Sequence, residues 1–134
     1  MTDDDYKRAL IQHRLERANI TLLDAYNLYN TGGSPVSIVN RSYYAMFYAA
    51  LALLATVDKE SSKHLGVLSL FDEIFVKTKI FPKDMSKMLH KAFDVRQIGD
   101  YEDNANVNME QAEQILKSAE QFVKTAEEKI SQDR

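Results

Sequence analysis

The chain has 134 residues, enough to bury a hydrophobic core, and we expect one domain over residues 1–134. It contains no cysteine, which excludes disulfides and thiolate metal ligands and is compatible with a reducing cytoplasm. A net charge of −3 without a basic tail argues against a DNA coat protein, and only four glycines and two prolines favour an all-helical fold.

Apolar residues recur every three or four positions along most of the chain, which predicts helices. Gly32 and Gly33 are expected to end the first helix, and Ser34 before Pro35 is a typical start of the next. The second helix is apolar on nearly all sides, as a central helix of a bundle would be. Five helices are expected, at about 4–31, 35–57, 62–77, 84–99 and 109–130. Their short connections predict an antiparallel up-and-down helical bundle.

The common catalytic and targeting motifs are missing from the sequence. It has no Gly-rich phosphate loop, no HExxH pair and no GxSxG elbow. The three histidines are far apart, and no two of them have the spacing of a helical metal-binding pair. We therefore expect no metal and no other cofactor. The acidic start MTDDDYKRAL and a longest apolar run of about 13 residues predict a cytoplasmic protein without membrane attachment.

Two arginines fall on apolar helix faces. Arg41 lies in the most apolar helix, where a buried guanidinium is costly unless it is paired. We expect it either to form a buried ion pair with another helix or to face a cleft or a subunit interface. Arg96 extends the apolar stripe of the fourth helix, and its i,i+4 pair with Asp100 is worth only about 0.2–0.5 kcal/mol. That is too little for full burial, so we expect Arg96 near solvent, at a groove edge or against another chain.

Polar and charged residues gather at the end of the fourth helix. Gly99 is expected to loosen the helix, and Tyr101 is expected to expose its phenol. Arg96, Asp100 and Tyr101 together offer a cation for a phosphate, a carboxylate and a hydroxyl. An ordinary charged helix end is the alternative interpretation.

The segment NRSYYAMFYAALALL resembles the signature of HEPN-domain proteins (higher eukaryotes and prokaryotes nucleotide-binding). His64 with Gly66, and Arg96 through Tyr101, match the later parts of the pattern in small stand-alone prokaryotic members, which are associated with toxin–antitoxin systems. The resemblance implies one HEPN-like helical domain that forms a homodimer, with a cleft at or near the dimer interface. It further implies a toxin–antitoxin or defence-like role, with a minimal nucleotidyltransferase as partner and RNA or a nucleotide as ligand.

Many members of this family are metal-independent endoribonucleases that use an arginine and, four to six residues later, a histidine. In this chain Tyr101 takes the place of that histidine. A tyrosine is only about 0.1% ionised at pH 7 and is a poor general base. His64 could supply an imidazole from another helix, although a capping or packing role is the other interpretation.

We therefore predict a binding cleft without full ribonuclease activity, lined by Arg41, Tyr44, Arg96, Asp100 and Tyr101. One alternative is an active endoribonuclease toxin, in which Arg96 clamps the phosphate and Tyr101 or His64 transfers a proton. The other is a purely structural partner subunit.

Overall fold

The structure is a computed structural model that describes residues 2–101 and 106–133, and of Tyr101 it describes only the backbone. The helices are α1 (Asp3–Asn30), α2 (Pro35–Thr56), α3 (His64–Phe71), a π-helical turn η1 (Asp72–Val76), α4 (Lys83–Tyr101) and α5 (Met109–Gln132). Residues 2–101 and 106–133 contain no strand. The predicted all-α class and the five predicted helices are confirmed.

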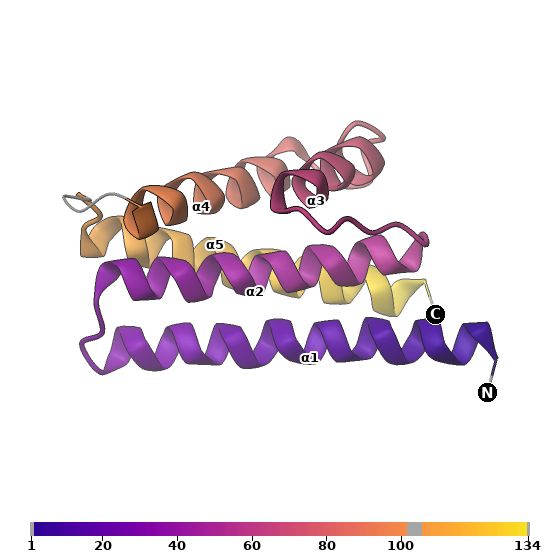
Figure 1. The fold of residues 1–134 in the computed structure, drawn as a ribbon, viewed down its shortest axis with the longest axis horizontal. Coiled ribbons are helices and arrows are strands. Elements are labelled where there is room, and N and C mark those ends of the chain that lie inside the picture. The colour runs from indigo at the N-terminus through magenta and orange to yellow at the C-terminus, as the bar shows by residue number, and fades with distance from the viewer. Residues whose placement is uncertain (1, 102–105, 134) are drawn as a thin grey trace.

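Helix α2 is the centre of the bundle. It packs against α1, α3, α4 and α5, and its buried side chains include Tyr43, Met46 and Leu53. Figure 1 shows α1 and α2 side by side and antiparallel, with α5 behind α2 and α4 along its other edge. The near-complete apolar surface of this helix is explained by its four neighbours.

One strip of α2 is only partly covered. Because α1 and α4 lie along opposite edges of α2 and their described backbones do not contact each other, neither covers the strip between them. Its side chains are only partly buried. We call this strip the open face of α2; it consists of Asn40, Arg41, Tyr44, Phe47, Tyr48 and Leu51.

Local capping signals start α2 and α5. The Ser34 hydroxyl accepts a hydrogen bond from the Ser37 backbone amide at 3.1 Å, and Pro35 follows as the first residue of α2. Before α5, the Asn108 side chain accepts from the Gln111 amide at 2.8 Å, and Gln111 accepts in return from the Asn108 amide. Both caps satisfy amides that the first helical turn leaves unpaired.

Two helices differ from their predicted courses. The third changes to a π-helical turn after Phe71, where the Lys77 amide donates to the Asp72 carbonyl, five residues earlier. The fourth does not loosen at Gly99, so that expectation is wrong: α4 continues to Tyr101. A side chain at Gly99 would place its Cβ 3.1 Å from Val36 of α2, so this glycine lets the end of α4 lie close against α2.

The aromatic core holds α3 in place beside α4 and α5. The Phe71 ring centroid lies 5.3 Å from that of Phe122 in α5, and Phe81 packs on both Phe71 and Phe75. No helix in the described ranges is both long and apolar enough to cross a lipid bilayer.

Candidate functional site

Five of the residues predicted for a site come together where α2, α3 and α4 meet. The Tyr44 hydroxyl accepts a hydrogen bond from Arg96 at 3.1 Å. Both Arg41 and Arg96 place their guanidinium carbon 5.2 Å from the Tyr44 ring centroid, and the His64 ring lies 5.7 Å from it. We use the name Arg96 cluster for these five residues and the supporting Tyr43: Arg41, Tyr43, Tyr44, His64, Arg96 and Asp100. The side chain of the predicted site residue Tyr101 lies outside the described residues.

Arg96 is more deeply buried than its local ion pair alone would allow. Its side chain is 14% exposed, and its Nε lies 2.8 Å from the Asp100 carboxylate. The Tyr44 hydroxyl and the faces of Tyr43 and Tyr44, at 5.8 and 5.2 Å, add a hydrogen bond and two cation–π contacts. The apolar stripe of α4 aims this arginine at α2, and the aromatic residues of α2 stabilise it there.

Arg41 is positioned by a neutral group. Its Nε and Nη2 donate to the Asn40 side-chain oxygen at 3.0 and 2.8 Å. No carboxylate of residues 2–101 or 106–133 forms an ion pair with it, so the expected buried pair is not found there. Arg41 instead borders an open hollow of about 350 Å³. That hollow is lined by Leu28, Val36, Ser37, Asn40, Arg41 and Asp100.

His64 is the first residue of α3 and packs against α2. Its ring stacks on Phe47 with centroids 4.4 Å apart, and its Nδ1 lies 2.7 Å from the Tyr43 hydroxyl. Burial, and secondarily the positive charge of Arg96, hold the pKa of His64 below its ordinary value of 6.5. The imidazole is therefore mainly neutral at pH 7.

The hydrogen bond to Tyr43 decides which nitrogen of His64 carries the proton. Tyr43 is fully buried, burial raises the pKa of its phenol, and no other hydrogen-bond partner for its hydroxyl is found in the described ranges. If Tyr43 accepted from Nδ1–H, its own O–H would stay unpaired in the core, which is costly. We infer that Tyr43 donates to Nδ1, so that His64 carries its proton on Nε2 and can donate there.

This arrangement suits the binding of an anion. Arg96 and Asp100 neutralise each other, while Arg41 has no ionic partner in the described part of the chain. Arg41 and the Nε2–H of His64 can donate to a phosphate oxygen. Across the described residues, no group of three or more histidine or acidic side chains is placed to hold a metal ion.

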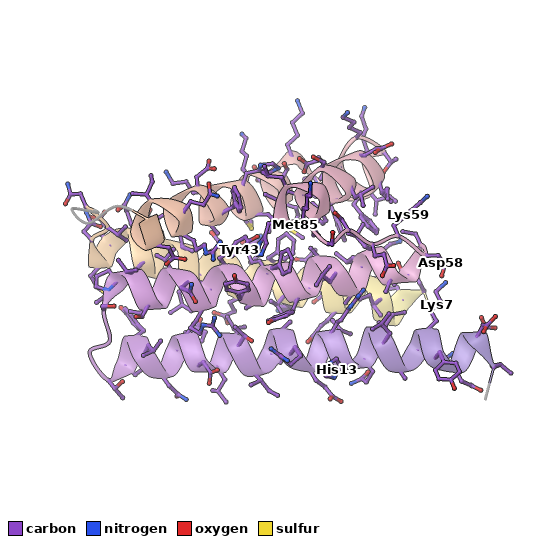
Figure 2. The ribbon with its side chains drawn as sticks, in the orientation of Figure 1. Lys7, His13, Tyr43, Asp58, Lys59 and Met85 are labelled. Carbon is purple, nitrogen blue, oxygen red and sulfur yellow. The ribbon has the colours of Figure 1, made fainter. Side chains whose placement is uncertain are left out.

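The other histidines lie outside the cluster. His13 is exposed on α1 (Figure 2), and His90 of α4 contacts Asp72, with Nε2 and Oδ2 2.7 Å apart. Sequence reasoning missed Tyr43 and Asn40 as supports of the site. A tyrosine on the most apolar stripe was the available signal for Tyr43, because a buried phenol requires a hydrogen-bond partner.

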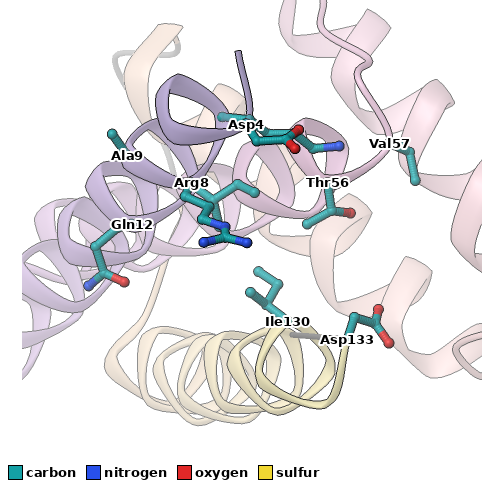
Figure 3. A pocket seen from close by; sticks show the side chains of 10 residues that line it. Asp4, Arg8, Ala9, Gln12, Thr56, Val57, Ile130 and Asp133 are labelled. Carbon is teal, nitrogen blue, oxygen red and sulfur yellow. The ribbon is translucent and has the colours of Figure 1, made fainter. Parts of the chain in front are cut away.

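A wider hollow, of about 950 Å³, lies between the ends of α1, α2 and α5 (Figure 3). Its lining mixes charges of both signs, with Asp4, Arg8 and Asp133 around its mouth. Lys7, which also lines the hollow, pairs with Asp58 at 3.4 Å, and the two lie together in Figure 2. None of the predicted site residues borders this hollow, so the Arg96 cluster is the stronger candidate.

Known proteins resemble this chain over most of its length. The sequence profile of the HEPN domain matches residues 11–129, which include the whole Arg96 cluster. The "Putative toxin MJ0142" of Methanocaldococcus jannaschii is 36% identical over 111 residues, covering 83% of this chain and 74% of that protein. A "UPF0332 protein" of Thermotoga maritima is 40% identical over 95 residues, 71% of either chain. The "Putative toxin MJ0605" of Methanocaldococcus jannaschii is 33% identical over 78 residues, 58% of either chain.

Proposed function

The chain belongs to the HEPN domain family, and from this premise we propose that its Arg96 cluster binds a phosphate group of RNA in a toxin–antitoxin-like system. The family and the two relatives named as toxins support a toxin–antitoxin-like or ribonuclease-related role. The observation that carries the choice of ligand is Arg41, a half-buried cation that shares the ring of Tyr44 with Arg96 and is positioned by an amide.

A phosphate fits the chemistry of this group. Asn40 holds the Arg41 guanidinium but leaves its charge intact, and a planar guanidinium matches phosphate oxygens with two parallel hydrogen bonds. His64 of α3, whose ring lies 5.7 Å from the Tyr44 ring, adds a second N–H donor. N–H donors of arginine and other side chains are the usual ligands of a phosphodiester.

Binding is favoured over cleavage because the described part of the cluster lacks a ready general base. Attack by a ribose 2′-hydroxyl requires a group that accepts its proton. With Tyr43 donating to Nδ1, His64 has its proton on Nε2 and presents a donor. Asp100 is engaged by Arg96.

The second candidate function is a metal-independent endoribonuclease. It is favoured by the position of His64, which shares the rings of Tyr43 and Tyr44 with Arg96 although the two residues come from different helices. In this mechanism Arg96 stabilises the negative charge of the phosphate. His64, with its proton on Nδ1 instead of Nε2, accepts the proton of the attacking ribose 2′-hydroxyl.

The proposal includes two partners that the family implies. A homodimer is the first of them, and the family implies that the cleft lies at or near its interface. A minimal nucleotidyltransferase is the expected second protein. Light scattering of the purified chain tests the dimer, and co-purification with a nucleotidyltransferase encoded beside it tests the second partner.

One experiment separates binding from cleavage. An end-labelled, mixed RNA pool is incubated in EDTA with the wild type, Arg96→Ala, Arg41→Ala, His64→Gln and Tyr101→Phe, and both anisotropy and product ends are measured. We expect RNA to bind without cleavage, and Arg41→Ala to weaken binding by about tenfold or more. Arg8→Ala, at the far hollow, is the charge-matched control.

The outcomes divide the two candidates. Cleavage that leaves 2′,3′-cyclic phosphate ends and is abolished by Arg96→Ala would establish the ribonuclease. It would refute the proposal that the cluster binds RNA without cleaving it. Loss of that cleavage in His64→Gln or in Tyr101→Phe would identify the group that transfers the proton. Binding that is absent, or equally weakened by Arg8→Ala, would refute the phosphate site.

A further inference from the structure

A second arginine–tyrosine pair lies on the open face of α2, beyond the Arg96 cluster. Arg17 of α1 donates from Nη2 to the Tyr48 hydroxyl at 2.9 Å, and its guanidinium carbon lies 4.8 Å from the Tyr48 ring centroid. Tyr48 follows Tyr44 by one helical turn, about 6 Å along the axis of α2, and the two ring centroids are 6.2 Å apart. The open face thus repeats the pairing of a tyrosine with an arginine from a neighbouring helix.

Neutral partners hold Arg17 and the arginines on either side of it. Asn40 holds Arg41, Tyr48 holds Arg17, and one turn further along α2 the Leu51 carbonyl accepts from Arg14 at 2.9 Å. None of these three arginines forms an ion pair with a carboxylate of the described ranges. A cation oriented by a neutral group keeps its charge for an external anion, because the group that holds it does not cancel that charge.

The distribution of arginine supports the same interpretation. The chain has six arginines and a net charge of −3, yet four of the six border this one face. They are Arg14, Arg17, Arg41 and Arg96. Arginine contacts therefore recur at about each turn of α2, which lines up several cations for the repeated phosphates of one nucleic-acid strand.

We propose that Arg17 and Tyr48 form a second nucleotide subsite, which binds the neighbouring phosphate of the single-stranded RNA held by the Arg96 cluster. This inference rests on the proposed function and extends it to the class of RNA. Arg17 contacts the phosphate, and an unpaired base stacks against the Tyr48–Arg17 pair. A duplex is disfavoured, because its base faces are already stacked and cannot reach the tyrosine.

Oligoribonucleotides of different length test the subsite. Fluorescein-labelled single strands of one, two, four and eight nucleotides are titrated by anisotropy at several salt concentrations, with a hairpin duplex as comparison. The variants are Arg17→Ala, Arg17→Lys and Tyr48→Leu, with Arg8→Ala as the matched control on the same helix and Arg41→Ala as the variant of the first site.

We expect the four-nucleotide strand to bind more tightly than the mononucleotide. Arg17→Ala should weaken binding of that strand about threefold to tenfold and reduce the slope of log K against log salt by about 0.7, while leaving the mononucleotide unchanged. Arg17→Lys should retain most of the salt slope, because it keeps the charge. Arg41→Ala should weaken both ligands.

The failures of the two proposals are distinguishable. If no length of RNA binds the wild type, both proposals are refuted. If the strand binds and Arg17→Ala has no more effect than Arg8→Ala, only the second subsite is refuted. Light scattering of each variant shows whether it still forms a dimer. If RNA binding is lost only in variants that no longer dimerise, Arg17 and Tyr48 contact a second copy of the chain and the proposed subsite is refuted.

Discussion

The hydrogen bond between Tyr43 and His64 offers a quantitative test of the site. The two side chains are 2.7 Å apart, Tyr43 is fully buried, and His64 is half-buried at the start of α3. Tyr43→Phe removes one oxygen and leaves Nδ1 of His64 without its donor. His64→Phe keeps an aromatic ring against Phe47 but leaves the buried Tyr43 hydroxyl unpaired.

The expected magnitudes follow from these contacts. An unpaired buried polar group costs about 1–3 kcal/mol, and because water can reach the half-buried imidazole we expect about 1–2 kcal/mol for Tyr43→Phe. His64→Phe should cost at least as much, since water cannot replace the partner of Tyr43. The double variant removes both polar groups, so it should be more stable than the sum of the single effects predicts by about 1 kcal/mol or more.

Urea unfolding followed by circular dichroism measures this coupling, and each kcal/mol should also shift Tm by roughly 4 °C. Tyr29→Phe is the matched control, because no hydrogen-bond partner for its hydroxyl occurs among the described residues. Effects that add within about 0.5 kcal/mol would refute the hydrogen bond. A ¹⁵N spectrum with the His64 proton on Nδ1 would refute the assignment of Tyr43 as donor.

Three further predictions concern stability. Phe122→Ala empties a fully buried position beside Phe71 and should lower the free energy of unfolding by about 3–5 kcal/mol in urea titrations; a loss below about 2 kcal/mol would contradict its place in the core. Gly66→Ala would put a methyl group 2.1 Å from the Ser61 hydroxyl, so it should cost about 1–3 kcal/mol in thermal unfolding, and the argument fails unless Ser61→Gly restores most of that loss. Because the pKa of His64 is lowered by folding, the unfolded chain binds more protons, and the free energy of unfolding should fall as the pH drops below about 6.5. The free energy of unfolding of His64→Gln should depend less on pH than that of the wild type. Equal pH profiles of the two proteins would exclude His64 as a cause of the loss of stability.

The helix starts were predictable where a few neighbouring residues decide them. Ser34 with Pro35 and Asn108 with Gln111 satisfy their own helix starts through contacts within three residues. The course of α4 was not predictable in the same way. Gly99 permits a helix end on local grounds, but the close approach of Val36 from α2 makes the same glycine a packing position inside a continuous helix.

In the candidate site, too, only the local contacts were predictable from the sequence. The Arg96–Asp100 pair lies within one helical turn and follows from spacing alone. The hydrogen bond of Arg96 to Tyr44 joins residues 52 positions apart, and that of His64 to Tyr43 joins residues 21 positions apart. No periodicity specifies such contacts, so the sequence left the role of His64 open between packing and chemistry.

The sequence by itself determined the helical class, the starts of α2 and α5, the central place of α2 and the family, because these depend on local propensity, on apolar periodicity and on a contiguous motif. The tertiary structure decided which polar groups meet. Only packing of α3 and α4 on α2 brings His64 and Arg96 onto Tyr43 and Tyr44, and only the separation of α1 from α4 leaves the open face of α2 partly exposed. A side chain's charge and hydrogen-bonding capacity are read from its identity, whereas its partners depend on the distances that the packed helices impose.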